Sequence, residues 1–96
     1  MPLHRADIGL IGLAVMGQNL ILNMADHGFV VCAFNRTTSK VDDFLHNEAK
    51  GKSVVGAHSV RELVAKLKKP RRVMMLVQGI IFSYIYYTYN HFNLFT

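Results

Sequence analysis

Residues 7–37 read DIGLIGLAVMGQNLILNMADHGFVVCAFNRT, and this stretch decides the fold class. It begins with a short apolar run, Asp7–Ile11, of the kind that forms a buried parallel strand. From Gly17 onward apolar residues recur at helical spacing, and Gly28 follows them as a stop signal. A second apolar run, Phe29–Phe34, predicts another buried strand. Strand, helix and strand in this order predict a βαβ unit.

The turn between the first strand and the helix reads GLAVMG, a G-x-A-x-x-G variant of the dinucleotide-binding fingerprint. Gly12 permits the tight turn, Ala14 lies where the backbone approaches a diphosphate, and Gly17 lets the helix lie close to the sheet. The free N–H groups and the dipole of the helix N-terminus favour an anion. Because strand, turn, helix and second strand all occur in order, the motif has its required context. We therefore predict a dinucleotide site that includes Gly12, Leu13, Ala14, Val15, Met16 and Gly17.

The end of the second strand indicates which dinucleotide binds. An NAD site usually has an acidic residue there, which bonds the ribose hydroxyls. This chain has Asn35, Arg36 and Thr37 instead. Arg36 offers a planar fork for a 2′-phosphate and a surface for adenine, and its neighbours offer hydrogen bonds. The sequence thus favours NADP over NAD.

The pattern continues to residue 77. We predict a helix capped by Ser39 and ended by Gly51, a third strand at Val54 and Val55, and a fourth strand at Val73–Val77. Between the last two, Ser59 and Glu62 form an S-x-x-E capping box for a helix that Pro70 closes. The fold class is α/β, a Rossmann-like βαβαβαβ parallel sheet that forms an incomplete dinucleotide-binding domain.

Composition limits the remaining possibilities. The 96 residues suffice for one domain, and the 51% of hydrophobic residues excludes disorder. The net charge of +5 suggests an anionic partner. The basic cluster around Pro70 has no interleaved aromatics, so we interpret it as a solvated helix end and expect no nucleic acid. The single cysteine and the interrupted N-terminus lead us to expect a cytoplasmic protein.

Outside the turn, no residue carries a strong chemical signal. The five histidines (His4, His27, His46, His58 and His91) lack metal-ligand spacing, and we predict neither a metal site nor a catalytic residue. Cys32 lies mid-strand between apolar neighbours and reads as a buried, inert thiol. Met74 and Met75 belong to the fourth strand and read as core.

The composition changes sharply near residue 79. All charged residues fall at or before Arg72, and all four tyrosines follow Phe82. We divide the chain into a partial NADP-binding domain, 1–78, and an uncharged aromatic tail, 79–96. The uncharged stretch from Val73 is long enough for a membrane span, but its polar Asn and His residues make one unfavourable. The alternative is an aromatic strand or helix that covers the sheet edge.

The segments DIGLIGLAVMGQNLILNMADHGF, VVCAFNRTTSKVDDFL, NEAKGKSVVGA and KLKKPRRVMMLV resemble the N-terminus of the 6-phosphogluconate dehydrogenase family. The wider β-hydroxyacid dehydrogenase group, which shares a similar turn, is the alternative. The resemblance implies an NADP-dependent oxidoreductase of the pentose phosphate pathway that converts 6-phosphogluconate to ribulose 5-phosphate with release of CO2. It also implies cofactor contacts at the Gly12–Gly17 turn, at Asn35, Arg36 and Thr37, and at Val77.

The resemblance ends after Gln78. The family continues with a nicotinamide-contacting asparagine, a substrate-binding serine and glycine segment, a catalytic lysine and glutamate, and a helical domain that forms a homodimer. The sequence GIIFSYIYYTYNHFNLFT stands here instead, and its residue types are those of AT-rich codons, which suggests translated non-coding sequence or a mispredicted gene end. We expect this chain to be inactive alone and to meet 6-phosphogluconate only within a full-length enzyme. The second hypothesis is a non-catalytic NADP-binding module or an unstable truncation product.

Overall fold

Strands and helices alternate along the chain from residue 8 to residue 75. The computed structural model describes residues 5–76 and the backbone of residues 83–87. The elements are β1 (Ile8–Ile11), α1 (Val15–Asp26), β2 (Val31–Phe34), α2 (Thr38–His46), β3 (Val54–Gly56), α3 (Val60–Ala65), β4 (Arg71–Met75) and β5 (Ser83–Tyr87).

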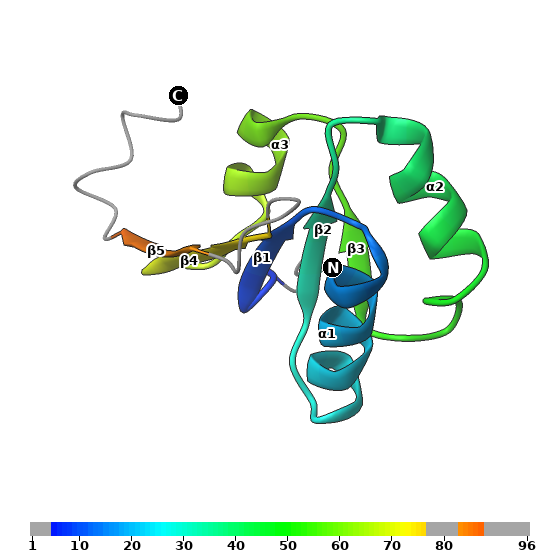
Figure 1. Cartoon of the computed structure of the whole chain (residues 1–96). Helices are drawn as coiled ribbons and strands as arrows, with labels where there is room; N and C mark the ends of the chain where they lie inside the picture. Colours follow the sequence, from blue (N-terminus) through cyan, green and yellow to red (C-terminus); the bar gives the residue numbers. More distant parts are fainter. Residues whose placement is uncertain (1–4, 77–82, 88–96) are drawn as a thin grey trace.

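A single sheet of five strands in the order β3-β2-β1-β4-β5 forms the centre of the fold (Figure 1). The pairs β2–β3, β1–β2 and β1–β4 are parallel, which confirms the predicted Rossmann-like α/β class. β5 pairs with β4 in the antiparallel direction, with Ile85 opposite Val73. The aromatic tail therefore contributes an edge strand over Ser83–Tyr87, which is one of the two alternatives that its composition offered, and the sheet is not wholly parallel.

The sheet has an apolar core on each face. On one face Leu10 of β1 and Val31 of β2 pack with Ile21 of α1 and Phe44 of α2. On the other face the adjacent β2 residue, Cys32, joins the cluster that α3 covers. This division follows from the strand pleat, which sends successive side chains to opposite faces. It explains why the two central strands read as continuous apolar runs rather than as alternating patterns.

The strand order creates the position where a ligand binds in such folds. From β1 the chain crosses to β2 on one side, and it later returns to β4 on the other side. β1 therefore lies where the strand order reverses, and open α/β sheets bind their ligands at the carboxyl ends of the strands at such a point.

Several predicted element boundaries were wrong. The helix after β2 begins at Thr38 with Thr37 as its N-cap, so Ser39 lies inside the helix and does not cap it. The same helix ends at His46, five residues before Gly51, which instead occupies a turn with φ of +81°. α1 begins at Val15, two residues before the predicted start at Gly17. Three residues separate each of these helices from the strand before it.

The fourth strand also lies earlier than predicted, at Arg71–Met75 instead of Val73–Val77. Arg71 and Arg72 are in the strand because they pair with Tyr87 and Tyr86 of β5, which the sequence pattern did not reveal. Val77 lies outside the described residues.

α3 confirms half of the predicted capping box. Ser59 is the N-cap, and its hydroxyl accepts the Glu62 N–H at 3.0 Å. The Glu62 carboxylate accepts the N–H of His58 at 2.7 Å, not that of Ser59. This hydrogen bond, and then the one from Lys66, lower the pKa of Glu62. The helix ends at Ala65, well before Pro70, because the chain then pairs with Ala6: the Ala6 N–H donates to the Lys66 carbonyl and the Ala6 carbonyl accepts the Lys68 N–H.

The basic cluster is more ordered than a solvated helix end. Lys66 Nζ donates to the Gly56 carbonyl at 2.7 Å, and it lies 2.9 Å from Glu62. Lys68 Nζ lies 2.6 Å from the Asp7 carboxylate. Both lysines therefore tie the end of α3 to neighbouring strands.

Among residues 5–76 and 83–87, no helix has the length and apolar character needed to cross a membrane. The uncharged stretch from Val73 contains the last three residues of β4 and all of β5, and its remaining residues beyond Leu76 lie outside the described ranges.

Candidate dinucleotide site

Two glycines allow the turn after β1 to pack tightly. Gly12 has φ of +115°, and a Cβ atom there would lie 2.5 Å from the Leu76 carbonyl oxygen. A Cβ atom on Gly17 would collide with the carbonyl oxygen of Gly12. Since both obstacles are backbone atoms, larger residues cannot be accommodated by a rotamer change. Both glycines thus have the structural roles that the motif predicts.

The N-terminus of α1 lacks the usual protein partner. Its N-cap is Ala14, which has no side-chain oxygen, and no acidic residue lies in the first turn. Most N-caps are Ser, Thr, Asp or Asn, and replacing one of these by Ala costs about 1 kcal/mol. Ala14, Val15 and Met16 are exposed, the latter two at 74% and 63%. The first N–H groups of the helix are therefore accessible to an anion.

The end of β2 lies beside this turn. The Leu13 N–H donates to Asn35 Oδ1 at 2.9 Å, although the two residues are 22 positions apart. The Asn35 amide nitrogen donates in turn to the Thr37 carbonyl at 3.2 Å. The Gly12 N–H adds a bond to the Phe34 carbonyl at 2.9 Å. The fold thus brings the two predicted halves of the site into direct contact.

Arg36 differs from its neighbour Asn35 in its surroundings. Asn35 is half-buried and bonded to backbone, whereas Arg36 is exposed. Within the described part of the chain, Arg36 makes no hydrogen bond or ion pair. Its guanidinium is therefore available to an anionic ligand at the carboxyl edge of the sheet.

Gln18 contacts the glycine turn of the candidate site, and sequence reasoning missed it. It lies in the first turn of α1, and its Nε2 donates to the Leu13 carbonyl at 3.0 Å. The only sequence signal was an amide side chain directly after the final glycine of the motif. Leu76 was also missed; its N–H donates to the Ile11 carbonyl at 2.9 Å and brings β4 against the turn.

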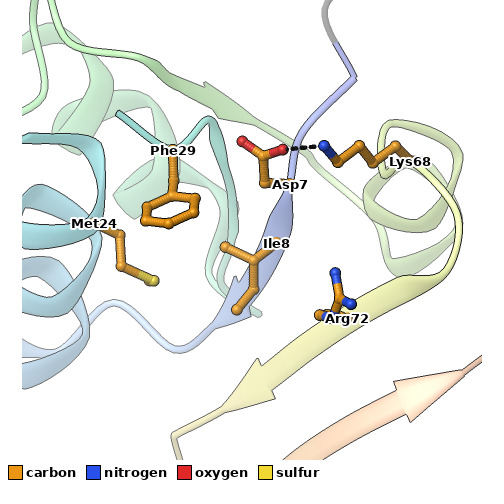
Figure 2. A pocket seen from close by; sticks show the side chains of 6 residues that line it. All are labelled: Asp7, Ile8, Met24, Phe29, Lys68 and Arg72. Carbon is orange, nitrogen blue, oxygen red and sulfur yellow. Dashed lines mark ion pairs between the residues drawn. The ribbon is translucent and has the colours of Figure 1, made fainter. Parts of the chain in front are cut away.

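A cavity lies at the amino edge of the sheet, opposite the candidate dinucleotide site. It measures about 300 Å³ and is lined by Asp7, Ile8, Met24, Phe29, Lys68 and Arg72 (Figure 2). Asp7 Oδ2 accepts the Val30 N–H at 2.8 Å. The Lys68 hydrogen bond, and then this backbone bond, lower the pKa of Asp7. Because parallel sheets bind ligands at their carboxyl ends, this cavity is separate from the dinucleotide site.

The other singled-out residues lie away from the turn. Cys32 is buried, and burial raises the pKa of its thiol to about 12, as expected for an inert cysteine. Met74 and Met75 are partly buried and pack against opposite cores, as predicted. His27 and His46 bond to backbone carbonyls of their own helices, and His58 pairs with Asp42 at 2.8 Å. Residues 5–76 contain no group of three His, Cys, Asp or Glu side chains placed to hold a metal. His4 and His91 lie outside the described ranges.

The sheet order, the glycine turn and the open helix N-terminus define a dinucleotide-binding domain of the Rossmann class. The sequence model for the NAD binding domain of 6-phosphogluconate dehydrogenase matches residues 7–80. The chain belongs to this family, which confirms the resemblance found in the sequence.

Relatives of high identity come from distant organisms. The decarboxylating 6-phosphogluconate dehydrogenase of Cunninghamella elegans is 85% identical over 74 residues, which are 77% of this chain and 15% of that protein. The Homo sapiens enzyme of the same name is 78% identical over 75 residues, which are 78% of this chain and 16% of that protein. The chain therefore spans about one sixth of the length of these relatives.

A solved structure confirms the fold. The Plasmodium falciparum 6-phosphogluconate dehydrogenase, studied in apo form and in complex with NADP+ and with 6-phosphogluconate, aligns with a TM-score of 0.65 at 46% identity. The alignment covers 74% of this chain and 15% of that one.

Proposed function

We propose that this chain binds NADP at the carboxyl edge of its sheet. The Gly12–Gly17 turn and the first N–H groups of α1 hold the diphosphate. Arg36, with Asn35 and Thr37, holds the 2′-phosphate of the adenosine half. Val77, which follows β4, contributes a further contact. The relative from Plasmodium falciparum is described with the same cofactor.

The Ala-capped N-terminus of α1 is the observation that carries this proposal. The helix has neither a capping oxygen nor an acidic residue in its first turn, so the positive end of its dipole faces solvent. The Gly12–Gly17 turn precedes this N-terminus, and neither Gly12 nor Gly17 has a Cβ atom that would keep a ligand away from the backbone. A diphosphate supplies the negative charge and the hydrogen-bond acceptors that this end lacks.

The end of β2 supports NADP as the form bound. The segment Asn35–Thr37 contains no carboxylate that would repel a 2′-phosphate. Arg36 is exposed and makes no ion pair with the described residues, so its planar fork remains available for a bidentate contact with phosphate.

We further propose that the chain represents the cofactor-binding part of a decarboxylating 6-phosphogluconate dehydrogenase. In such an enzyme the bound cofactor accepts a hydride from 6-phosphogluconate, which yields ribulose 5-phosphate and CO2. This chain's own residues bind and orient the cofactor. The rest of the protein supplies the acid, the base, most of the substrate site and the dimer contacts. Residues 1–78 form this partial domain, 79–96 are a tail unlike the family, and the compartment is the cytoplasm.

Fluorescence titration of the 96-residue chain with NADPH and NADH tests the binding proposal. We expect saturable NADPH binding, weaker NADH binding, and competition by NADP+. Binding of NADPH should weaken as salt concentration rises, because the contacts with phosphate are electrostatic.

Two outcomes contradict the proposal. The absence of NADPH binding to a chain that is folded by circular dichroism would exclude a self-sufficient site. Equal affinity for the two nucleotides would mean that the Asn35–Thr37 segment does not contact the 2′-phosphate.

A further inference from the structure

The two peptide groups on either side of Leu13 in the glycine turn are each held by a carboxamide side chain. The N–H of Leu13 donates to Asn35 Oδ1 at 2.9 Å, and the carbonyl of Leu13 accepts from Gln18 Nε2 at 3.0 Å. The first carboxamide comes from the end of β2 and the second from the first turn of α1. The Leu13 side chain is 2% exposed and packs in the core, which fixes the residue at a third point.

The orientation of each carboxamide follows from its backbone partners. A backbone N–H is only a donor, so it requires the oxygen of Asn35, and the Thr37 carbonyl requires the amide nitrogen. Likewise the Leu13 carbonyl requires the amide nitrogen of Gln18. An aspartate or a glutamate at either position would lose a donor that the observed bonds use.

The geometry points to Gln18 and Asn35 as a pair of positioning residues, which we call the carboxamide clamp, for the diphosphate subsite. This inference rests on the proposed NADP function. Asn35 holds the peptide group before Leu13 and Gln18 holds the one that leads into Ala14. Together they set the direction of the first free N–H groups of α1. Preorganised donors bind an anion better than mobile ones, because less conformational entropy is lost on binding.

The clamp also separates the roles of Asn35 and Arg36. Asn35 uses its oxygen on the turn and one amide hydrogen on Thr37, and its second amide hydrogen remains for a ligand. Arg36 makes no such contact with the turn. Loss of the clamp should therefore weaken every dinucleotide, whereas loss of Arg36 should weaken only those with a 2′-phosphate.

The decisive variant is Gln18→Met, which keeps the length and helix propensity of the side chain but removes the donor. In titrations of the full 96-residue chain, we expect the affinities for NADPH and NADH to fall by the same factor, about three- to tenfold. Arg36→Ala, measured in parallel, should weaken NADPH alone. The matched control is Asn23→Leu, which replaces an exposed amide further along α1 and should change neither affinity.

A purely structural role for Gln18 predicts a different result. It would lower the melting temperature of Gln18→Met without changing the affinity of the folded chain for either nucleotide. That result, or a loss confined to NADPH, would overturn the inference.

Amide hydrogen exchange tests the clamp without any nucleotide. The Leu13 amide should be protected in the wild-type chain and should exchange at least about tenfold faster in Asn35→Leu. Gln18→Met, which leaves the core untouched, should show a smaller acceleration at the same amide. An unprotected Leu13 amide in the wild type would overturn the clamp. If the wild type binds no nucleotide but protects Leu13, the proposed function fails while the clamp stands as a feature of the fold.

Discussion

At the residue scale, two neighbours at the end of β2 show how exposure separates structural from recognition roles. Asn35 is half-buried and ties the glycine turn to the strand, whereas the next side chain, Arg36, is exposed and makes no bond to the described residues. An exposed guanidinium with no partner among residues 5–76 is suited to a phosphate. The two predictions at this scale concern Arg36 and a carboxylate at the other edge of the sheet.

Replacing Arg36 by glutamate should reverse the nucleotide preference. The change removes a charge-assisted bond and adds repulsion, so NADPH affinity should fall by about ten- to a hundredfold. NADH affinity should hold or rise slightly, because the carboxylate can accept bonds from ribose hydroxyls. Fluorescence titrations at fixed salt measure both affinities, and Lys50→Glu, an exposed charge reversal beyond α2, is the control. Equal losses for both nucleotides would assign Arg36 a role in the fold alone.

Replacing Asp7 by asparagine should destabilise the chain in a pH-dependent way. Lys68 and the Val30 N–H lower the pKa of Asp7, so the folded state binds its proton more weakly than the unfolded state. The stabilisation is therefore present above the ordinary value of 3.8 and is lost as the pH falls through the lower folded value. We expect a loss of about 1 kcal/mol at neutral pH, since the pair is partly exposed.

Urea unfolding of wild type and Asp7→Asn at neutral pH and near pH 3 measures this difference. The difference in the free energy of unfolding between the two proteins should be smaller at the lower pH. Asp43→Asn removes an exposed carboxylate of α2 and is the matched control. A difference in unfolding free energy that does not change with pH would show that the charge of Asp7 is not the source of the stabilisation.

At the scale of elements, the short helix α3 depends on its cap more than the longer helices do. It spans only Val60–Ala65, and helices of this length are not stable alone. Ser59 satisfies one of its free N–H groups, and Leu63 anchors it to the core shared with Cys32. The cap and the apolar anchor together hold the only helix that covers this face of the sheet in the described part of the chain.

Ser59→Ala should therefore lower the free energy of unfolding by about 1 kcal/mol. Ser59→Asp, which keeps an acceptor at the N-cap, should retain most of the stability. Chemical denaturation followed by far-UV circular dichroism compares the three proteins. Equal stability of the alanine variant would show that Glu62 and His58 alone secure the start of the helix.

β5 is the element that tests the division of the chain at residue 79. Its five residues, Ser83–Tyr87, pair with all of β4, so a chain that ends at Gln78 exposes the edge of β4. We expect this truncation to lower the melting temperature by about 4–8 °C for each kcal/mol lost. A chain that ends at Tyr87 keeps the strand and is the control. An unchanged or higher melting temperature after truncation at Gln78 would support a tail that is independent of the fold.

At the scale of the whole molecule, the chain has a candidate cofactor site at the carboxyl edge of its sheet. The acid and base that a dehydrogenase reaction needs are not found among the residues of that site. The segments Gly12–Gln18 and Asn35–Thr37, together with Leu76, contain no lysine, histidine or carboxylate. General acid–base catalysis requires such a group within hydrogen-bond reach of the reacting atoms. The chain covers only 15–16% of the relatives whose reaction it would share.

The 96-residue chain should therefore produce no ribulose 5-phosphate from 6-phosphogluconate and NADP. The assay follows NADPH formation and product together, with protein purified from a host that lacks its own enzyme. A full-length relative assayed in the same buffer is the positive control. Product above the blank would show that residues 1–96 contain an acid and a base that the described structure does not place at the cofactor edge.

The sequence by itself determined the succession of the first four strands and three helices along the chain. It also determined the glycine turn and the class of ligand that this turn is typical of. These features depend on local spacing, because side-chain periodicity distinguishes strand from helix. Gly12 is required by its own positive φ, and Gly17 by the carbonyl of Gly12 in the same turn. The tertiary structure alone decided the clamp of Leu13 by Asn35 and Gln18, the Asp7–Lys68 pair, and the addition of β5 to β4. Most of these contacts join residues far apart in the chain. They arise only when strand register and crossovers bring those residues together. Because the central strands are apolar on both faces, no alternation of side chains along them specifies that register.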